Sequence, residues 1–268
     1  MIDLHCHILP GLDDGARDLA HAVAMARIAR DDGVTHIAGT PHLNKGGFVF
    51  PDLGVFDEAR DRLSRALRDE HIDITLLAGA EVHITHGLLD EVRARRQGLT
   101  LAGSSYLIVE FPQDHVFSEA KDLFFDLMSE GLVPVIAHPE KNTTFSRFPR
   151  LLFDLVSMGA LAQLNAGSLM DGGTTEAGET ARKFLGLGLA HFIGSDGHNT
   201  HAKAPRLAAA SEAAAAVIGE KGARALVTDN PRAVIADQEI PFHPDPVDPA
   251  GKERKLKLRI PGFLKPGK

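Results

Sequence analysis

The chain has 268 residues, of which 44% are apolar and 24% charged, and its net charge is −7 at pH 7. This length and composition fit one large α/β domain. No apolar run approaches the roughly 20 residues that span a bilayer, and the first residues lack the basic and apolar segments of a signal peptide. We therefore expect a cytoplasmic protein. The negative charge argues against nucleic acid as a partner. Cys6 is the only cysteine, which excludes an intrachain disulfide. It does not form a C-x5-R phosphatase loop either, because that loop needs an arginine at position 12, where this chain has Leu12.

Short apolar runs, typical of strands, alternate along the chain with longer segments. Helical spacing of apolar residues predicts helices at residues 18–32, 55–68 and 118–130. Strands are predicted at residues 1–4, 35–39, 72–80, 107–109, 133–137, 161–164 and 191–194. This rhythm gives seven β-then-α units. It predicts an α/β fold with a parallel sheet, and this number of units usually closes into a TIM-like barrel.

The sequence His5-Cys6-His7 lies at the end of the first predicted strand. Side chains alternate between the two faces of a strand, so His5 and His7 are predicted to project together and Cys6 to the other side. Two neutral imidazoles on one face can bind a divalent cation. The alternative is one structural histidine in the core and one exposed histidine.

Six residues that can bind a metal fall at or just past the carboxyl ends of six different predicted strands. They are His7, His42, Glu81, Glu110, His138 and Asp196. A barrel brings these strand ends to one rim, where barrel active sites are built. Imidazole and carboxylate without thiolate suit manganese, iron, zinc or magnesium in a multinuclear site.

Several further residues near this rim are candidates for roles beside these six. His83, His115 and His201 are candidates for supporting positions around the metal site. Asp13 and Asp14 are adjacent, so we expect only one of them to face the site and the other to cap the following helix.

The order of these motifs resembles the PHP (polymerase and histidinol phosphatase) superfamily, and within it the bacterial CpsB/YwqE-type protein tyrosine phosphatases. The motifs are His5-x-His7, Asp14-Gly15, Thr40-Pro41-His42, Gly79-Ala80-Glu81, Glu110-Phe111, Ala137-His138-Pro139-Glu140, Gln163-Leu164-Asn165 and Ser195-Asp196-x-His198-Asn199. The likeness extends to about residue 238 and includes Asp229-Asn230-Pro231-Arg232.

This resemblance implies a distorted (β/α)7 barrel of the PHP type with three divalent metal ions, often manganese. The implied ligands are His5, His7, Asp14, His42, Glu81, Glu110, His138, Asp196 and His198. The family removes phosphate from the tyrosine-rich tails of bacterial kinases that control capsule or exopolysaccharide export. Two alternatives remain: another PHP phosphoesterase, acting on a small molecule such as histidinol phosphate, and a binding protein whose metal site has lost activity.

The resemblance also suggests roles for residues beyond the ligands. Glu81 is the candidate to bridge two metals, and His42 or His201 the candidate to protonate the leaving group. The family commonly has arginine directly after its His-x-Glu motif, where this chain has Lys141, and another shortly after Asp-x-His. Lys141 and Arg206 are therefore the predicted phosphate-binding cations, with Lys203 as a second candidate for the latter position.

The last part of the chain differs in composition from the rest. We divide the sequence into a barrel domain at residues 1–243 and, at residues 244–268, a Pro-rich linker with a basic tail. Residues 251–268 hold seven Lys or Arg and one Glu, which leaves −13 on the remainder. The tail is expected to dock on the protein's own acidic body or on a second subunit, or to make peripheral contact with an anionic membrane.

Overall fold

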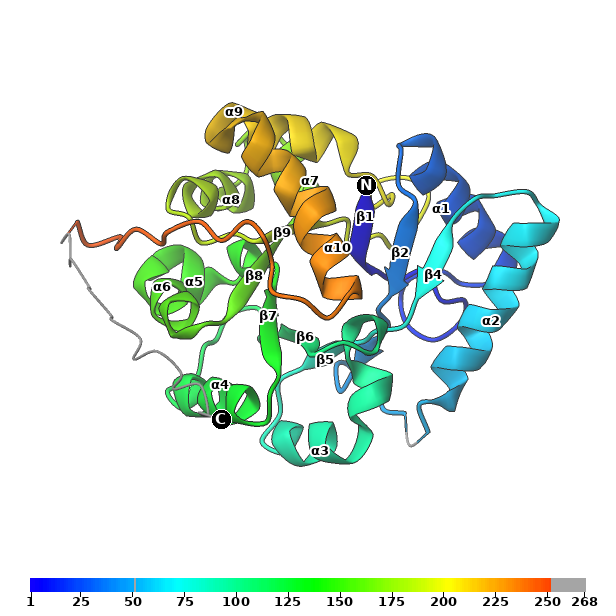
Figure 1. Ribbon diagram of the computed structural model, residues 1–268, viewed down its shortest axis with the longest axis horizontal. Coiled ribbons are helices and arrows are strands. Elements are labelled where there is room, and N and C mark those ends of the chain that lie inside the picture. The colour runs from blue at the N-terminus through cyan, green and yellow to red at the C-terminus, as the bar shows by residue number, and fades with distance from the viewer. Residues whose placement is uncertain (51, 252–268) are drawn as a thin grey trace, which may run out of the picture.

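Parallel strands form the centre of the protein and helices cover them (Figure 1). The structure is a computed structural model and describes residues 1–50 and 52–251. The strands are β1 (Ile2–Cys6), β2 (His36–Gly39), β3 (His42–Leu43), β4 (Thr75–Leu77), β5 (Glu81–His83), β6 (Tyr106–Glu110), β7 (Val133–Ala137), β8 (Leu161–Asn165) and β9 (Phe192–Gly194). The predicted α/β class with a parallel sheet is confirmed.

Most of the described helices lie between the strands in sequence, two follow the last strand, and they lie outside the strands in space. The longer ones are α1 (Leu19–Asp31), α2 (Gly54–Asp69), α3 (Leu88–Leu99), α4 (Ala120–Ser129), α6 (Pro149–Met158), α8 (Glu176–Gly186) and α9 (Ala208–Arg224). Short ones are α5 (Thr143–Arg147), α7 (Ala166–Met170) and α10 (Asn230–Ile235), with single turns at Leu101–Gly103 and Pro139–Lys141 and a π-helical turn at Ala225–Asp229. Within the described ranges no helix is both long and apolar enough to cross a membrane.

The strands pair in two parallel groups. One sheet has the order β1-β2-β4 and the other β3-β5-β6-β7-β8-β9. An isolated parallel bridge between Cys6 and Gly197 joins the end of β1 to the chain just after β9. All residues of β1, β6 and β8 are buried, as expected for parallel strands that helices cover on the outside.

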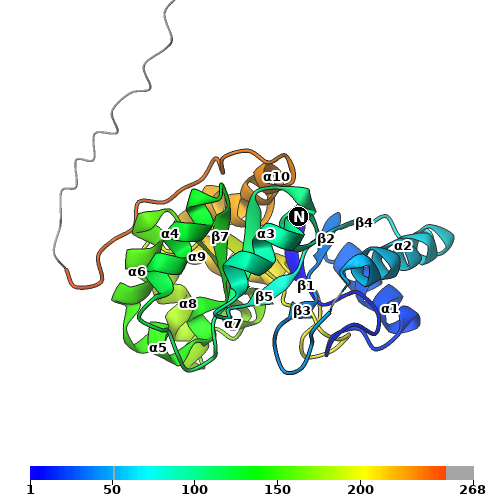
Figure 2. The ribbon, with the colours of Figure 1, turned by 90° about the horizontal axis from the view of Figure 1, so that it is seen from below.

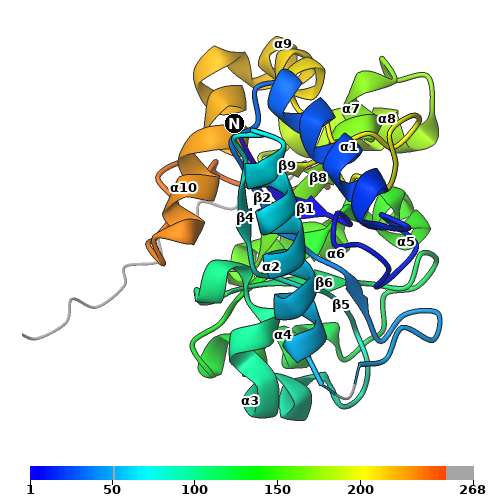
Figure 3. The same ribbon diagram turned by 90° about the vertical axis from the view of Figure 1, so that its right-hand side faces the viewer.

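Helices α1 and α2 pack beside the smaller sheet, and α2 lies along its outside (Figure 3). Helix α1 begins where the sequence predicts, because the Asp18 carboxylate accepts a hydrogen bond from the His21 N–H (2.8 Å) and caps the first turn. Helix α2 buries Phe56, Leu63 and Leu67 on one face. The apolar faces of these helices pack on the outer side of the smaller sheet and do not cover the strand ends that carry the site.

The strand predicted at residues 72–80 is shorter than expected, because only Thr75–Leu77 forms a strand, β4. A break separates β4 from β5, which begins at Glu81, and β2 is likewise followed by a break before β3. Pro41 lies in the second break and has no N–H to give to a ladder. Gly79 lies in the first, and a Cβ there would be 3.1 Å from Thr40 Cγ2. The two breaks lie side by side, since the Glu81 N–H donates to the Pro41 carbonyl, and they turn His42 and Glu81 towards the same point.

Beyond α10 the chain returns across the body and stays in contact with it (Figure 2). The Tyr106 hydroxyl donates to the Gln238 carbonyl (2.7 Å), and the Val247 N–H donates to the Leu187 carbonyl (2.8 Å). The start of the segment predicted as a linker, residues 244–251, therefore makes specific contacts. Most of the predicted basic tail, residues 252–268, lies outside the described residues.

We expect Asn230→Ala to destabilise the protein by about 3 kcal/mol. The buried Asn230 amide donates to the carbonyls of His191 and Phe242 and accepts from the Phe242 N–H, and its removal leaves these buried groups without partners. Urea unfolding measures the loss. Asp229→Ala is the neighbouring control, because Asp229 only pairs with an exposed arginine; equal losses in both variants would contradict the assignment.

Candidate metal centre

Side chains of types that can bind a metal stand at the ends of several strands along one rim. His7 comes directly after β1, Glu110 is the last residue of β6, His138 comes directly after β7, and Asp196 comes two residues after β9. His138 (φ +30°) and Asp196 (φ +51°) adopt left-handed backbone conformations, which are uncommon outside glycine. This backbone turns each side chain from the end of its strand into the centre.

The structure brings all nine residues that the sequence predicts as ligands into one contiguous centre. Their ligand atoms form four groups, in each of which every atom lies within 4.8 Å of the others. The groups are His7, Asp14, His42 and His198; His5, His7 and Glu81; His5, His138 and Asp196; and His42, Glu81 and Glu110. Since the groups share members, the geometry suits several adjacent cations.

Glu81 lies at the middle of this centre and is fully buried. Its Oε1 is 2.8 Å from His138 Nε2 and 3.3 Å from His5 Nε2, and its Oε2 is 2.7 Å from His42 Nδ1 and 3.4 Å from His7 Nε2. One carboxylate therefore faces four imidazoles, two on each oxygen. This is the geometry of a carboxylate that can bridge two cations.

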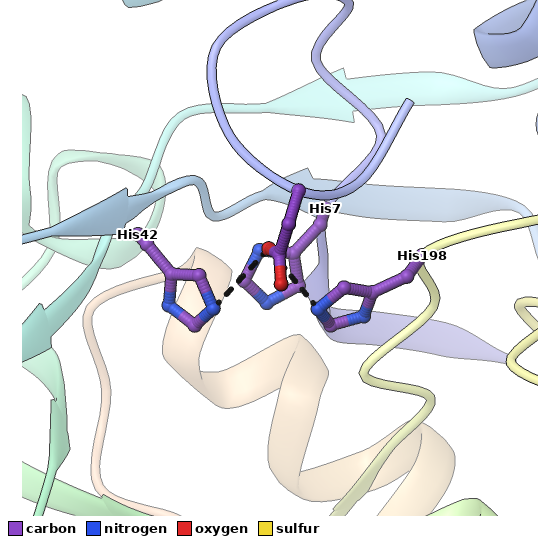
Figure 4. Close-up of side chains that lie close together, drawn as sticks. His7, His42 and His198 are labelled. Atoms are coloured by element: carbon purple, nitrogen blue, oxygen red, sulfur yellow. Dashed lines mark ion pairs between the residues drawn. The ribbon is translucent and has the colours of Figure 1, made fainter. Parts of the chain in front are cut away.

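Asp14 lies in the loop after β1, and Figure 4 shows His7, His42 and His198, the three histidines that form one candidate metal group with it. Its Oδ1 is 3.5 Å from His42 Nε2 and 3.5 Å from His198 Nε2, and the ring of His7 lies beside that of His198. The Asp14 side chain is 56% exposed, in contrast to the buried histidines. This group is the part of the centre that is most open to solvent.

Asp13 also faces the centre, which the sequence interpretation missed. Its buried carboxylate is 2.7 Å from His7 Nδ1 and accepts hydrogen bonds from the backbone N–H groups of His42 and Gly15. The prediction that one of the paired aspartates caps the helix is wrong, because Asp18 is the cap. A carboxylate on Nδ1 fixes the tautomer that leaves Nε2 free for a metal.

Amide side chains support two further members of the centre. Gln163 Oε1 is 2.7 Å from His5 Nδ1, and the Asn165 amide donates to Asp196 Oδ2 (2.8 Å). The other oxygen, Asp196 Oδ1, is turned towards the histidines, 3.3 Å from His7 Nε2. The sequence signal for these residues was the motif Gln163-Leu164-Asn165 at the end of a predicted strand, which did not by itself indicate these contacts.

The electrostatics of the centre favour bound cations. Burial opposes ionisation of Glu81, but the charge of His5 and a hydrogen bond from His138 hold the pKa of its carboxyl well below the ordinary value. Burial and the charge of His7 lower the pKa of His198 to about 4, so its imidazole is neutral at pH 7. Ionised carboxylates and neutral imidazole are the forms that bind metals.

Two buried atoms at the middle of the centre lack a hydrogen-bond partner. They are His42 Nδ1 and Glu81 Oε2, which lie 2.7 Å apart. Buried polar atoms are normally paired, so a facing nitrogen and oxygen without a hydrogen bond between them indicate a place for a cation. The residues present thus fit the predicted divalent metals.

A cavity of about 290 Å³ opens beside the centre. Lys45, Lys141 and Lys203 line it, and the Lys141 ammonium donates to Asp196 Oδ2 (2.8 Å). Arg206, a predicted phosphate-binding residue, is exposed and is not among the lining residues, whereas its alternative Lys203 is. Lys45 was not identified from the sequence, because it lies outside every recognised motif.

The three histidines predicted as candidates for supporting positions around the metal site differ in position. His83 lines the cavity and its Nδ1 is 3.3 Å from Glu110 Oε2. His115 and His201 are exposed and are not among the lining residues. Of the three, His83 is therefore the one placed to support the centre.

A family model described as "Capsular polysaccharide synthesis, CpsB/CapC" matches residues 1–236. The tyrosine-protein phosphatase YwqE of Bacillus subtilis is 42% identical over 74% of this chain and 78% of its own length. The putative tyrosine-protein phosphatase CapC of Staphylococcus aureus is 32% identical over 74% of this chain and 77% of its own.

One solved structure covers nearly the whole described fold. It comes from work on YwqE of Bacillus subtilis and CpsB of Streptococcus pneumoniae, described as unique metal-dependent tyrosine phosphatases. Its TM-score is 0.86 at 37% sequence identity, and the match covers 92% of this chain and 99% of that one. The likeness therefore extends over most of the fold.

Asp13→Asn is expected to weaken binding of divalent metal about 10- to 100-fold while the fold is retained. The amide has one acceptor oxygen, so it cannot keep all of the contacts to His7, His42 and Gly15. Equilibrium dialysis against Mn²⁺ measures the affinity. Asp18→Asn is the matched control in the same loop, because asparagine also caps helices; the same loss in that variant would refute the role of Asp13.

Proposed function

Because the chain belongs to the CpsB/CapC family of capsular polysaccharide synthesis proteins, we propose that it is a metal-dependent tyrosine-protein phosphatase. The observation that carries this proposal is the buried Glu81, which faces four imidazoles beside a cavity lined by lysines. Carboxylates and imidazoles hold divalent cations, and lysines attract the phosphate dianion. Both halves of a phosphatase site are therefore supplied by neighbouring residues.

The finer architecture that we propose is the distorted (β/α)7 barrel of the PHP type. Counting β2 with β3 and β4 with β5 as two broken strands gives seven strands, and the Cys6–Gly197 bridge links the last to the first. The breaks are the distortion. This arrangement supports the proposal because it places every candidate ligand at one rim.

We further propose that the centre holds three divalent ions, with manganese as the favoured metal. The residues that would hold them are His5, His7, Asp14, His42, Glu81, Glu110, His138, Asp196 and His198. Bound there, the ions would polarise the phosphate oxygens and lower the pKa of the attacking water. The hard carboxylate and borderline imidazole donors support manganese over metals that prefer thiolates.

The protein's own groups bind and orient the phosphate. Lys141 is placed between Asp196 and the cavity, so its ammonium can pass from the carboxylate to a substrate oxygen. His42 has one nitrogen against Glu81 and the other facing Asp14, so we assign it to metal binding and not to proton transfer. A phenolate is a fairly good leaving group and departs without an essential general acid.

The substrate that we propose is a phosphotyrosine protein, in particular the tyrosine-rich tail of a bacterial tyrosine kinase of polysaccharide export. The relatives are named as tyrosine-protein phosphatases, and the matching family is one of capsular polysaccharide synthesis, which supports the phosphotyrosine class and the connection with capsule synthesis. The openness of the Asp14 side of the centre supports access by a side chain that projects from a larger partner.

Hydrolysis of a phosphotyrosine peptide is expected to stop on chelation and to resume when Mn²⁺ is added, while iodoacetamide has no effect. Cys6 is fully buried, and burial raises the pKa of its thiol well above the ordinary value, so no thiolate takes part. Activity that survives chelation would refute the metal mechanism. Faster turnover of histidinol phosphate than of the peptide would instead favour a small-molecule substrate.

Lys141→Arg is expected to lower KM for a phosphotyrosine peptide several-fold, a gain of about 1 kcal/mol. The guanidinium can bind two phosphate oxygens, where the ammonium is a single point charge. Steady-state kinetics on metal-loaded protein measure the change. Unchanged constants would mean that residue 141 remains on Asp196 and does not reach the phosphate.

A further inference from the structure

A short hairpin after β3 carries a lysine into the cavity. The Asn44 N–H donates to the Phe48 carbonyl (2.7 Å), and the Phe48 N–H donates to the Lys45 carbonyl (2.9 Å). Gly46 and Gly47 form its tip with φ of +57° and +93°, the left-handed conformations that a two-residue hairpin turn requires. The backbone of Lys45 is therefore held in a defined turn.

The hairpin is fixed at its base on two sides. The Asn44 amide donates to Glu91 of α3 (2.5 Å), and the Phe48 ring stacks on His42, with centroids 6.1 Å apart and planes at 19°. Its backbone is thus tied to the centre itself. What remains free to move is the four-carbon side chain of Lys45, which is 39% exposed.

The Lys45 ammonium lies against two residues of the candidate metal groups. Its Nζ is 2.6 Å from Glu110 Oε1 and 3.4 Å from His42 Nε2. Glu110 and His42, together with Glu81, form one of the four candidate metal groups. An ammonium and a divalent cation on the same carboxylate repel each other, and removing water from the site strengthens this repulsion.

A side chain displaced from Glu110 has one favourable destination nearby. Lys45 lines the same cavity as Lys141 and Lys203, in which a phosphate dianion would lie. The long aliphatic stem allows the ammonium to turn from one anion to another without a change of backbone. Moving to the phosphate replaces the lost contact with Glu110 by a contact with a doubly charged group.

Resting on the proposed function, we infer that Lys45 is a substrate-binding residue that pairs with Glu110 in the metal-free protein and moves to the substrate phosphate once metal occupies Glu110. The lysine keeps the acidic side of the centre neutralised until metal arrives. Metal loading and phosphate binding are then coupled, because the same event frees the ammonium that holds the phosphate.

The competing possibility is that Lys45 stays on Glu110 and orients it for the metal. The two roles of Lys45, competitor of the metal or positioning residue for Glu110, predict opposite changes in metal affinity when Lys45 is replaced. If Lys45 competes with metal, Lys45→Met leaves metal affinity unchanged or raises it; if Lys45 orients Glu110, the same variant lowers it. They also differ in phosphate affinity, which only the first role connects to Lys45.

The test compares wild type, Lys45→Met and Lys45→Arg as full-length proteins. Mn²⁺ affinity is measured by equilibrium dialysis of metal-free protein, and affinity for inorganic phosphate by calorimetry at full Mn²⁺ loading, verified by metal analysis. We expect Lys45→Met to bind Mn²⁺ at least as tightly as wild type and phosphate about tenfold more weakly, and Lys45→Arg to recover most of the phosphate affinity.

Lys121→Met is the matched control, because Lys121 is a comparably exposed lysine paired with Asp154 on the outer helices, outside the cavity lining. It is expected to change neither affinity. Weaker Mn²⁺ binding by Lys45→Met, or unchanged phosphate affinity at full loading, overturns the inference. If phosphate affinity falls as expected but wild type does not hydrolyse phosphotyrosine, the role of Lys45 stands and the proposed function fails.

Discussion

The arrangement of the centre depends on one buried anion. The Glu81 carboxylate has no exposed surface, and removing such a charge from water costs several kcal/mol unless cations or hydrogen bonds offset it. Its partners include imidazoles from β1 (His5), from the start of β3 (His42) and from the residue after β7 (His138). The anion is tolerated only where these strand ends meet, so the fold and the site require each other.

Residues around the candidate ligands hold them in position through further contacts. Asp13 and Gln163 each occupy the Nδ1 side of a histidine, and Asn165 occupies one oxygen of Asp196. Each contact uses the face of the ligand that points away from the centre and leaves the inner atom available. These outer contacts are thus made before any cation binds, so cation binding has to order the ligand side chains less.

The sequence predicts the centre better than the strands that carry it. Six of the nine candidate ligands were identifiable because they lie at or just past the ends of apolar runs, and a parallel fold brings such ends together. His5 followed from its spacing to His7, whereas Asp14 and His198 were assigned through the family resemblance. The breaks at Pro41 and Gly79 were not predicted, since they follow from a close approach of two segments distant in sequence. Asp13 was misassigned for the same reason: its partner His42 is brought to it only by the tertiary fold.

The cations around the cavity are lysines, and this choice has a physical consequence. A guanidinium binds a carboxylate through a planar fork and remains where that geometry is satisfied, whereas an ammonium on a flexible stem moves between neighbouring anions at little cost. Lys45 and Lys141 each lie on a candidate metal ligand, Glu110 and Asp196, beside the space for substrate. Lysine therefore suits a site whose cations must stabilise the carboxylates without metal and the phosphate with it. The cost is looser control of phosphate orientation, which a substrate with one phosphate on a rigid aromatic ring tolerates best.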